Sequence, residues 1–135
     1  MPLTPTQTLA RILAAGVTAA LSLALASCAA GEVPSSGPLA VHERPDYGMD
    51  ALLGGVLRTD GGCVRVEPSA GSAGTATVVS FPAGDATWNG EVLTWRGEEY
   101  RDGDEISLGG GLAPEPPGYV PEDCGDLEVW QVSPL

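Results

Sequence analysis

The pattern of hydrophobic and polar positions divides the chain into an apolar leader and a longer region of short segments. From Ile12 to Ala26 the sequence ILAAGVTAALSLALA runs for 15 residues without a charge. As a helix this run would be about 22 Å long, shorter than the ~30 Å hydrocarbon core of a membrane. Its length and position therefore predict a signal peptide over residues 1–27 that is removed, and not a permanent membrane span.

Downstream of residue 50 the pattern favours short β-strands separated by turns. No window has a convincing period of 3.6 residues, so helices are not expected. Asp60-Gly61 and Asp102-Gly103 are typical of tight hairpin turns, and Asn89-Gly90 precedes another apolar run. The predicted strands are 52–59, 63–68, 75–81, 91–95, 98–101, 104–110 and 127–132.

Six to seven short strands at this spacing predict an all-β domain over residues 51–135. We expect a small closed or partly open barrel of the OB-like kind, with a small β-sandwich as the alternative. Roughly 85 residues are few for a single hydrophobic core, which favours a stabilising disulfide.

Residues 28–50 are rich in proline, glycine and serine and predict a flexible tether between the leader and the domain. Such a chain would span roughly 25–30 Å. His42, the one histidine of the sequence, lies in this segment. A catalytic role for His42 is not expected, because a mobile tether does not hold a side chain in place.

The leader ends in Leu25-Ala26-Ser27-Cys28, which resembles the lipobox of bacterial lipoproteins. The resemblance implies cleavage before Cys28 and transfer of diacylglycerol to its thiol. With a further fatty acid such as palmitate, the acyl chains would anchor the protein stably to the outer, extracytoplasmic face of the cell membrane. An ordinary secretory signal with an incidental cysteine is the alternative.

Cysteine counting agrees with this interpretation. The sequence has three cysteines, and lipidation of Cys28 leaves Cys63 and Cys124 as a pair in an oxidising compartment. We expect these two to form a disulfide. A metal site is the competing interpretation, but two cysteines without a nearby histidine are a poor ligand set.

A second resemblance covers most of residues 53–132. The segments GGCVRVE, VVSFPAG and YRDGDEISLGGG, followed by a late cysteine and VW, resemble small uncharacterised extracytoplasmic domains of actinobacterial lipoproteins. That family implies neither an activity nor a set of site residues for this chain.

Charge excludes some partners. The chain has 18 acidic residues, six arginines and no lysine, and its net charge is −12. Such a protein is repelled by nucleic acid and by anionic lipid headgroups, so no nucleic-acid partner is expected. No cofactor and no metal are expected either. The acidic segment DGDE (102–105) fits a solvated turn better than a calcium loop, because Ile106 follows where a further oxygen ligand is needed.

Two further features have both a structural and a functional interpretation. Gly109-Gly110-Gly111 lacks the lysine and helix of a phosphate loop, so we expect it to allow a bend or a close approach of another segment. Trp95 and Trp130 fit core positions of strands. Trp88, beside the Asn89-Gly90 turn, is the candidate for an exposed aromatic that stacks on a ligand.

Three classes of function remain. The leading one is a non-enzymatic, lipid-anchored domain that contacts another protein of the cell envelope or has a structural role there. The second is a module that binds glycan or cell-wall material through Trp88 and nearby acids. The third is a small hydrolase with paired carboxylates, which is disfavoured because the predicted domain has no histidine, lysine or free thiol.

The lipobox generates a direct prediction. Cys28→Ala should leave the protein unprocessed or release it from the membrane fraction, because only the thiol can accept the diacylglycerol. Intact-mass measurement of the native protein should show loss of residues 1–27 together with added acyl mass. A soluble product that is cleaved elsewhere and carries no lipid would contradict the lipoprotein interpretation.

Overall fold

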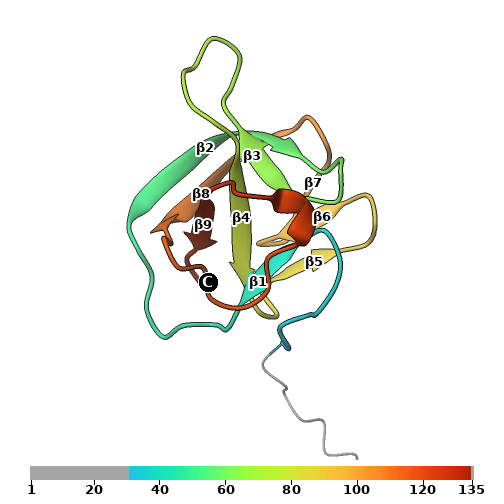
Figure 1. The fold of residues 1–135 in the computed structure, drawn as a ribbon, viewed down its shortest axis with the longest axis vertical. Helices are drawn as coiled ribbons and strands as arrows, with labels where there is room; N and C mark the ends of the chain where they lie inside the picture. The colour runs from blue at the N-terminus through green and yellow to red at the C-terminus, as the bar shows by residue number, and fades with distance from the viewer. Residues whose placement is uncertain (1–30, 135) are drawn as a thin grey trace, which may run out of the picture.

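The computed structural model describes residues 31–134, which form an all-β structure (Figure 1). The leader and Cys28 lie outside the described residues. Within 31–134 there are nine strands and one short 3-10 helix, in the order β1 (Ala40–His42), β2 (Ala51–Arg58), β3 (Arg65–Glu67), β4 (Thr77–Pro82), β5 (Ala86–Trp88), β6 (Leu93–Trp95), β7 (Glu98–Tyr100), β8 (Glu105–Leu112), η1 (Glu122–Cys124) and β9 (Val129–Val132).

Five of these strands close into a barrel. β2 pairs with β3 and β8, β3 pairs with β4, and β8 pairs with β9, all antiparallel. β9 then pairs in parallel with β4 and completes the ring. The five barrel strands in chain order are β2, β3, β4, β8 and β9. The first of them, β2, lies between β3 and β8, and the third, β4, lies beside the fifth, β9, as in OB-like barrels. The expectation of an OB-like barrel is confirmed, and the alternative of a sandwich is wrong.

The other strands cover parts of this barrel. β4 pairs with β3 through Thr77 and Val78, and β1 then pairs in parallel with the next part of β4, residues 80–82. β5, β6 and β7 form a separate antiparallel sheet, which the chain makes between β4 and β8. From β6, Leu93 and Trp95 enter the main core, where the ring of Trp95 lies 5.1 Å from that of Phe81. The small sheet therefore covers the barrel end at which β4 stops and β8 begins.

β4 is buried at every position because both of its faces are covered. Val79 and Phe81 point into the main core with the inward residues of the other barrel strands. Val78, on the opposite face, packs in a second cluster with Cys63 and Cys124. The strand therefore lies between the barrel interior and the long β8–β9 connection, which crosses its outer face.

The predicted disulfide is present. Cys63 and Cys124 are bonded, with their Cα atoms 5.1 Å apart and 61 positions between them in the sequence. The bridge joins the β2–β3 turn to η1, which precedes the last strand. The strands on either side of the bridge, β3 and β9, are not neighbours, because β4 lies between them. Closing a loop of this length contributes about 4 kcal/mol in the chain-entropy description.

The segment expected to be a flexible tether, residues 28–50, contains a strand that packs on the barrel. Residues 39–42 are buried, and β1 lies inside this segment. Its backbone is tied to the barrel on two sides, because Val64 N–H donates to Pro38 O and Ala83 N–H donates to His42 O. Leu39, Ala40 and Val41 form a run of only three apolar residues, and three residues are too few to predict a strand. β1 forms here because β4 pairs with it.

All seven predicted strand segments overlap an observed strand, and two strands were not predicted. β1 lies within the predicted tether, and β5 lies between the predicted strands 75–81 and 91–95. In β8 the glycines behave as expected, because a Cβ at Gly110 would overlap the backbone of Gln131 and one at Gly111 would meet the side chain of Met49. Close approach of neighbouring segments explains both glycines.

His42 is a buried residue of β1 and not part of a mobile segment. It has no exposed surface, and its Nδ1 lies 3.0 Å from Ser80 Oγ of β4. Nε2 has no hydrogen-bond partner among the described residues. Burial lowers the pKa of His42, and the nearby Asp85 carboxylate opposes part of that effect. The folded state therefore holds the imidazole in its neutral form near neutral pH.

This burial predicts a pH-dependent stability. The unfolded chain takes up a proton at His42 near pH 6.5, whereas the folded chain does so only at lower pH, so stability rises with pH across that interval. The free energy of unfolding in urea should fall as the pH is lowered from 7.5 to 5.5. The fall should be smaller in His42→Gln, which cannot be protonated. An equal fall in both proteins would show that other groups cause it.

Candidate functional site

Trp88 lies on β5, where it is half-buried. Part of its indole packs against the main core, and the rest is open to solvent. The chain turns immediately after it, because Asn89 Oδ1 accepts the N–H groups of Glu91 and Val92 at 3.0 and 2.8 Å. Trp95 and Trp130 are 4% and 8% exposed, which confirms that they are core residues. Trp88 thus has an accessible face, and its role in ligand stacking stays a prediction.

The open side of Trp88 forms one wall of a broad depression of about 750 Å³, here called the Trp88 groove. It is built from segments that are far apart in the sequence. The N-terminal segment contributes Ser36, and the β2–β3 turn contributes Thr59 and Gly62. Trp88 stands at the β5–β6 turn, and the β8–β9 connection contributes Tyr119, Glu122 and Asp123.

The disulfide holds two walls of this groove together. Gly62 and Asp123 flank Cys63 and Cys124 in the sequence, so the bridge fixes the β2–β3 turn against η1. Gly62 has a φ of +74°, and a Cβ there would overlap the Asp123 carboxylate. The absence of a side chain at Gly62 therefore lets Asp123 lie over the turn.

Tyr119 is fixed in the same wall. Its hydroxyl donates to Gly37 O at 2.7 Å, and its backbone exchanges two hydrogen bonds with Val41 of β1, at 3.0 and 2.8 Å. These bonds tie the proline-rich β8–β9 connection to the N-terminal segment. The second aromatic ring of the groove is therefore held in place before any ligand binds.

The groove is acidic. Glu122 and Asp123 are exposed, and no arginine lines it. Exposed carboxylates accept hydrogen bonds from hydroxyl or amide groups, while the two aromatic rings offer flat apolar surface. This combination suits a neutral, hydroxyl-rich ligand or a cationic one and disfavours an anionic one.

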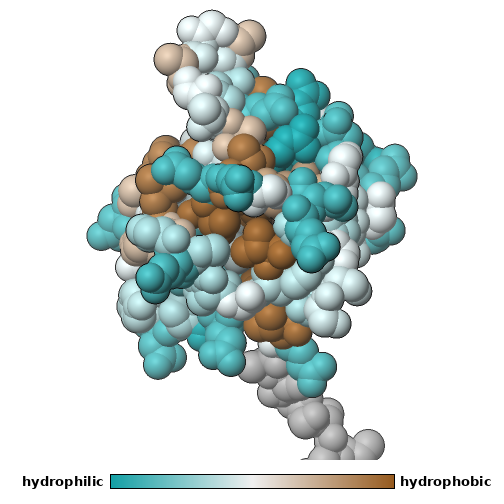
Figure 2. Space-filling view, viewed as in Figure 1, coloured by the Kyte–Doolittle hydropathy of each residue, from teal (hydrophilic) through white to brown (hydrophobic). Residues whose placement is uncertain are grey.

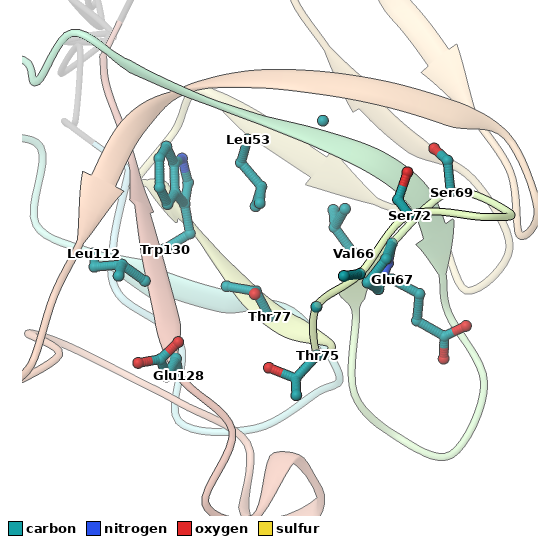
Figure 3. Close-up of a pocket in the computed structure, with 14 residues that line it drawn as sticks. Leu53, Val66, Glu67, Ser69, Ser72, Thr75, Thr77, Leu112, Glu128 and Trp130 are labelled. Atoms are coloured by element: carbon teal, nitrogen blue, oxygen red, sulfur yellow. The ribbon is translucent and has the colours of Figure 1, made fainter.

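A second hollow, of about 380 Å³, lies at the end of the barrel away from the small sheet. All five barrel strands contribute to it, together with the β3–β4 loop (68–76), and we call it the barrel mouth (Figure 3). Figure 2 shows hydrophobic side chains in view at the centre of the molecule below this loop, surrounded by hydrophilic ones. Leu53, Val66, Leu112 and Trp130 form its apolar part.

The two cysteines and the histidine within residues 31–134 have structural roles. Cys63 and Cys124 are bonded to each other, and His42 is buried against Ser80. Among residues 31–134 no group of three or more histidine, cysteine, aspartate and glutamate side chains is arranged to hold a metal ion. Nor does this part of the chain contain a helix long and apolar enough to cross a membrane.

Sequence reasoning found Trp88 but missed the residues that face it. Tyr119, Glu122 and Asp123 lie between the last two predicted strands, in a segment rich in proline and acidic residues that has no strand pattern of its own. Their closeness to Cys124 was the available signal, because the bridge to Cys63 brings this loop to the β2–β3 turn. The barrel mouth gave no local signal, since its residues come from every strand of the barrel.

Comparison of the chain with protein-family models, with curated proteins and with solved structures found no match. The functional inference therefore depends on the geometry and chemistry of these two hollows.

Proposed function

We propose that this protein is a lipid-anchored, non-catalytic binding domain at the extracytoplasmic face of the cell membrane, and that the Trp88 groove binds a neutral glycan. The observation that carries this proposal is the pairing of two aromatic side chains, Trp88 and Tyr119, with two exposed carboxylates in one depression. Sugars present apolar faces for stacking and hydroxyl groups for carboxylates, so each wall of the groove has a function.

The position of the groove on the fold supports the same ligand class. OB-like barrels bind oligonucleotides and oligosaccharides with the loops that join their first and second, and fourth and fifth, strands. Here those loops are the β2–β3 turn and the β8–β9 connection, and both line the groove. The net charge of −12 disfavours the oligonucleotide, which leaves the oligosaccharide.

The start of the described chain bears on how the domain is held. The backbone of Gly31 packs against that of Gly84, so closely that a Cβ at Gly31 would overlap Gly84. Three residue steps separate Cys28 from Gly31, which is at most about 10 Å of extended chain. With diacylglycerol on Cys28, the Gly84 end of the barrel would therefore lie close to the bilayer. The domain would not be separated from the membrane by the ~25–30 Å that a flexible 22-residue tether would span.

A non-catalytic role is supported by how the reactive side chains are used. A nucleophile needs a neighbouring base within hydrogen-bond reach and access to substrate. The His42–Ser80 pair has the distance but no exposed surface, and both cysteines of the domain are in the bridge. The domain would act by holding its ligand and not by transforming it.

The second candidate, contact with an envelope protein, is favoured by a different observation. Leu112 is 52% exposed and borders the barrel mouth. Exposed apolar side chains beside a hollow are typical of a protein-binding surface.

Titration with the β-1,4-linked tetramer of N-acetylglucosamine, and pull-down with insoluble peptidoglycan, test the glycan proposal. Trp88→Ala should weaken binding at least about tenfold, as is usual when an aromatic anchor at the centre of a site is removed. Glu122→Gln should also weaken it, and because Glu122 is exposed this variant should fold normally.

Tyr47→Ala is the matched control, because Tyr47 is an aromatic residue that is 69% exposed and lies outside the groove. Its binding should equal that of the native protein. If neither glycan preparation binds, or if Tyr47→Ala lowers affinity as much as Trp88→Ala, the Trp88 groove is not a glycan site.

A further inference from the structure

The barrel mouth has the size and lining of a pocket for one or two apolar side chains. Leu53 of β2 and Trp130 of β9 face each other across it, and Leu112 of β8 forms its rim (Figure 3). Its volume of about 380 Å³ exceeds the ~150 Å³ of a cavity that holds benzene. Leu112 is 52% exposed, so this apolar surface is already open to solvent.

A buried hydrogen-bond donor lies in the same wall. Trp130 is 8% exposed, and its Nε1 has no acceptor among the described residues. Figure 3 shows the nitrogen on the edge of the indole nearer to Leu53. The nitrogen also lies close to Gly110 of β8 and has no surface exposed to solvent. An unpaired buried N–H group is unfavourable, so a ligand that displaces the partly buried Leu53 side chain and brings an oxygen acceptor to this edge recovers part of that cost. An alkyl chain cannot supply such an acceptor, whereas a peptide carbonyl can.

Charge selects the rest of the ligand. The residues that line the mouth include two carboxylates, Glu67 and Glu128, and no basic side chain. Glu67 is paired with Arg58 and Arg65 at 3.2 Å each. Glu128 is exposed and has no ion pair within residues 31–134, so its carboxylate can pair with a cation from outside. The rim therefore favours a basic group and repels an acidic one.

A smaller hollow of about 310 Å³ adjoins the mouth and shares Leu112 and Glu128 with it. Pro114, Pro116 and Leu127 line its far side. Side chains at alternate positions of an extended chain point to the same side. One extended segment could therefore place two apolar side chains in the two hollows, with Glu128 between them.

From these features we propose that the barrel mouth binds an extended peptide segment of a partner protein, in which two apolar side chains at positions i and i+2 are flanked by basic residues. The apolar side chains fill the two hollows, a backbone carbonyl accepts the Trp130 N–H, and a basic side chain pairs with Glu128. This site is separate from the Trp88 groove and does not require that the groove bind a glycan.

The mouth is well placed for such a partner. Thr77, the first residue of β4, lines it, and Gly84 follows shortly after the other end of that strand. Seven residue steps of strand are roughly 23 Å. If the domain is anchored through Cys28, the mouth opens away from the Gly84 end and toward the envelope. Figure 1 shows the β3–β4 loop, one wall of the mouth, at the opposite end of the molecule from the start of the described chain.

The proposal is tested by NMR titration of the lipid-free domain chain, residues 29–135, with capped peptides. The sequence KFALK has the proposed pattern, EFALE reverses its charge, and KSASK removes its apolar side chains. KFALK should shift the Trp130 indole N–H resonance downfield as the group gains an acceptor. EFALE and KSASK should bind at least about tenfold more weakly, because each lacks one of the required contacts.

Variants locate the site. Leu112→Ser and Glu128→Gln should each weaken KFALK binding about tenfold, and both positions are exposed, so the barrel should fold. Leu52→Ser and Glu105→Gln are matched controls, since both residues are exposed but lie outside both hollows. Their affinities should be unchanged.

Three results would overturn the proposal. They are the absence of any saturable shift at Trp130 with KFALK, equal binding of EFALE, and equal losses in Leu52→Ser and Leu112→Ser. Glycan binding is read separately from the Trp88 indole and should be unaffected by Leu112→Ser. Failure at the barrel mouth is therefore distinguishable from failure at the Trp88 groove.

Discussion

The parallel pairing of β4 with β9 closes the barrel, and the Cys63–Cys124 bridge secures the segment that makes this pairing possible. β9 follows a connection of sixteen residues that crosses the outer face of β4. Without a fixed point along that connection, the chain entropy lost in bringing β9 back to β4 would be larger. The bridge supplies the fixed point five residues before β9 begins, and its sulfur atoms pack in the second hydrophobic cluster.

The same connection forms the proposed binding surfaces. Its middle part carries Tyr119, Glu122 and Asp123 to the Trp88 groove. Its last residue, Glu128, lines the barrel mouth together with Leu112, the residue of β8 that precedes the connection. A long irregular segment would ordinarily be mobile. Here the disulfide and the hydrogen bonds of Tyr119 to Gly37 and Val41 hold it against the domain. A scaffold that is thin in core residues thereby gains rigid loops, which lowers the entropy cost of binding a ligand.

The strands with a strong local signal could be predicted from the sequence, and those that depend on distant partners could not. The β-branched residues of β4 and the alternating residues of β8 predict strands, and the number of cysteines predicts the disulfide. β1 consists of Ala40, Val41 and His42, which become a strand because β4 offers an unpaired edge beyond its contact with β3. Its histidine is buried through the same pairing, which a reading of the segment as a tether could not anticipate.

The candidate site shows the same division. Trp88 was identifiable as an aromatic residue beside a turn. Tyr119 lines the same groove only because a disulfide between cysteines 61 positions apart in the sequence holds the β8–β9 connection against the β2–β3 turn. The barrel mouth was beyond prediction because its lining depends on the order of all five barrel strands. Sequence periodicity fixes which face of a strand is apolar, and not which strands become neighbours.

The Cys63–Cys124 bridge joins two walls of the Trp88 groove. Glycan titration of oxidised and reduced protein measures whether the proposed binding depends on this bridge. The Trp88 indole resonance would be followed with the N-acetylglucosamine tetramer at a temperature where β4 amides remain protected from exchange in both forms. The oxidised protein should show a saturable shift, and the reduced protein should bind at least about tenfold more weakly, because its groove walls are no longer fixed. Equal affinity in the two forms would contradict this dependence on the bridge.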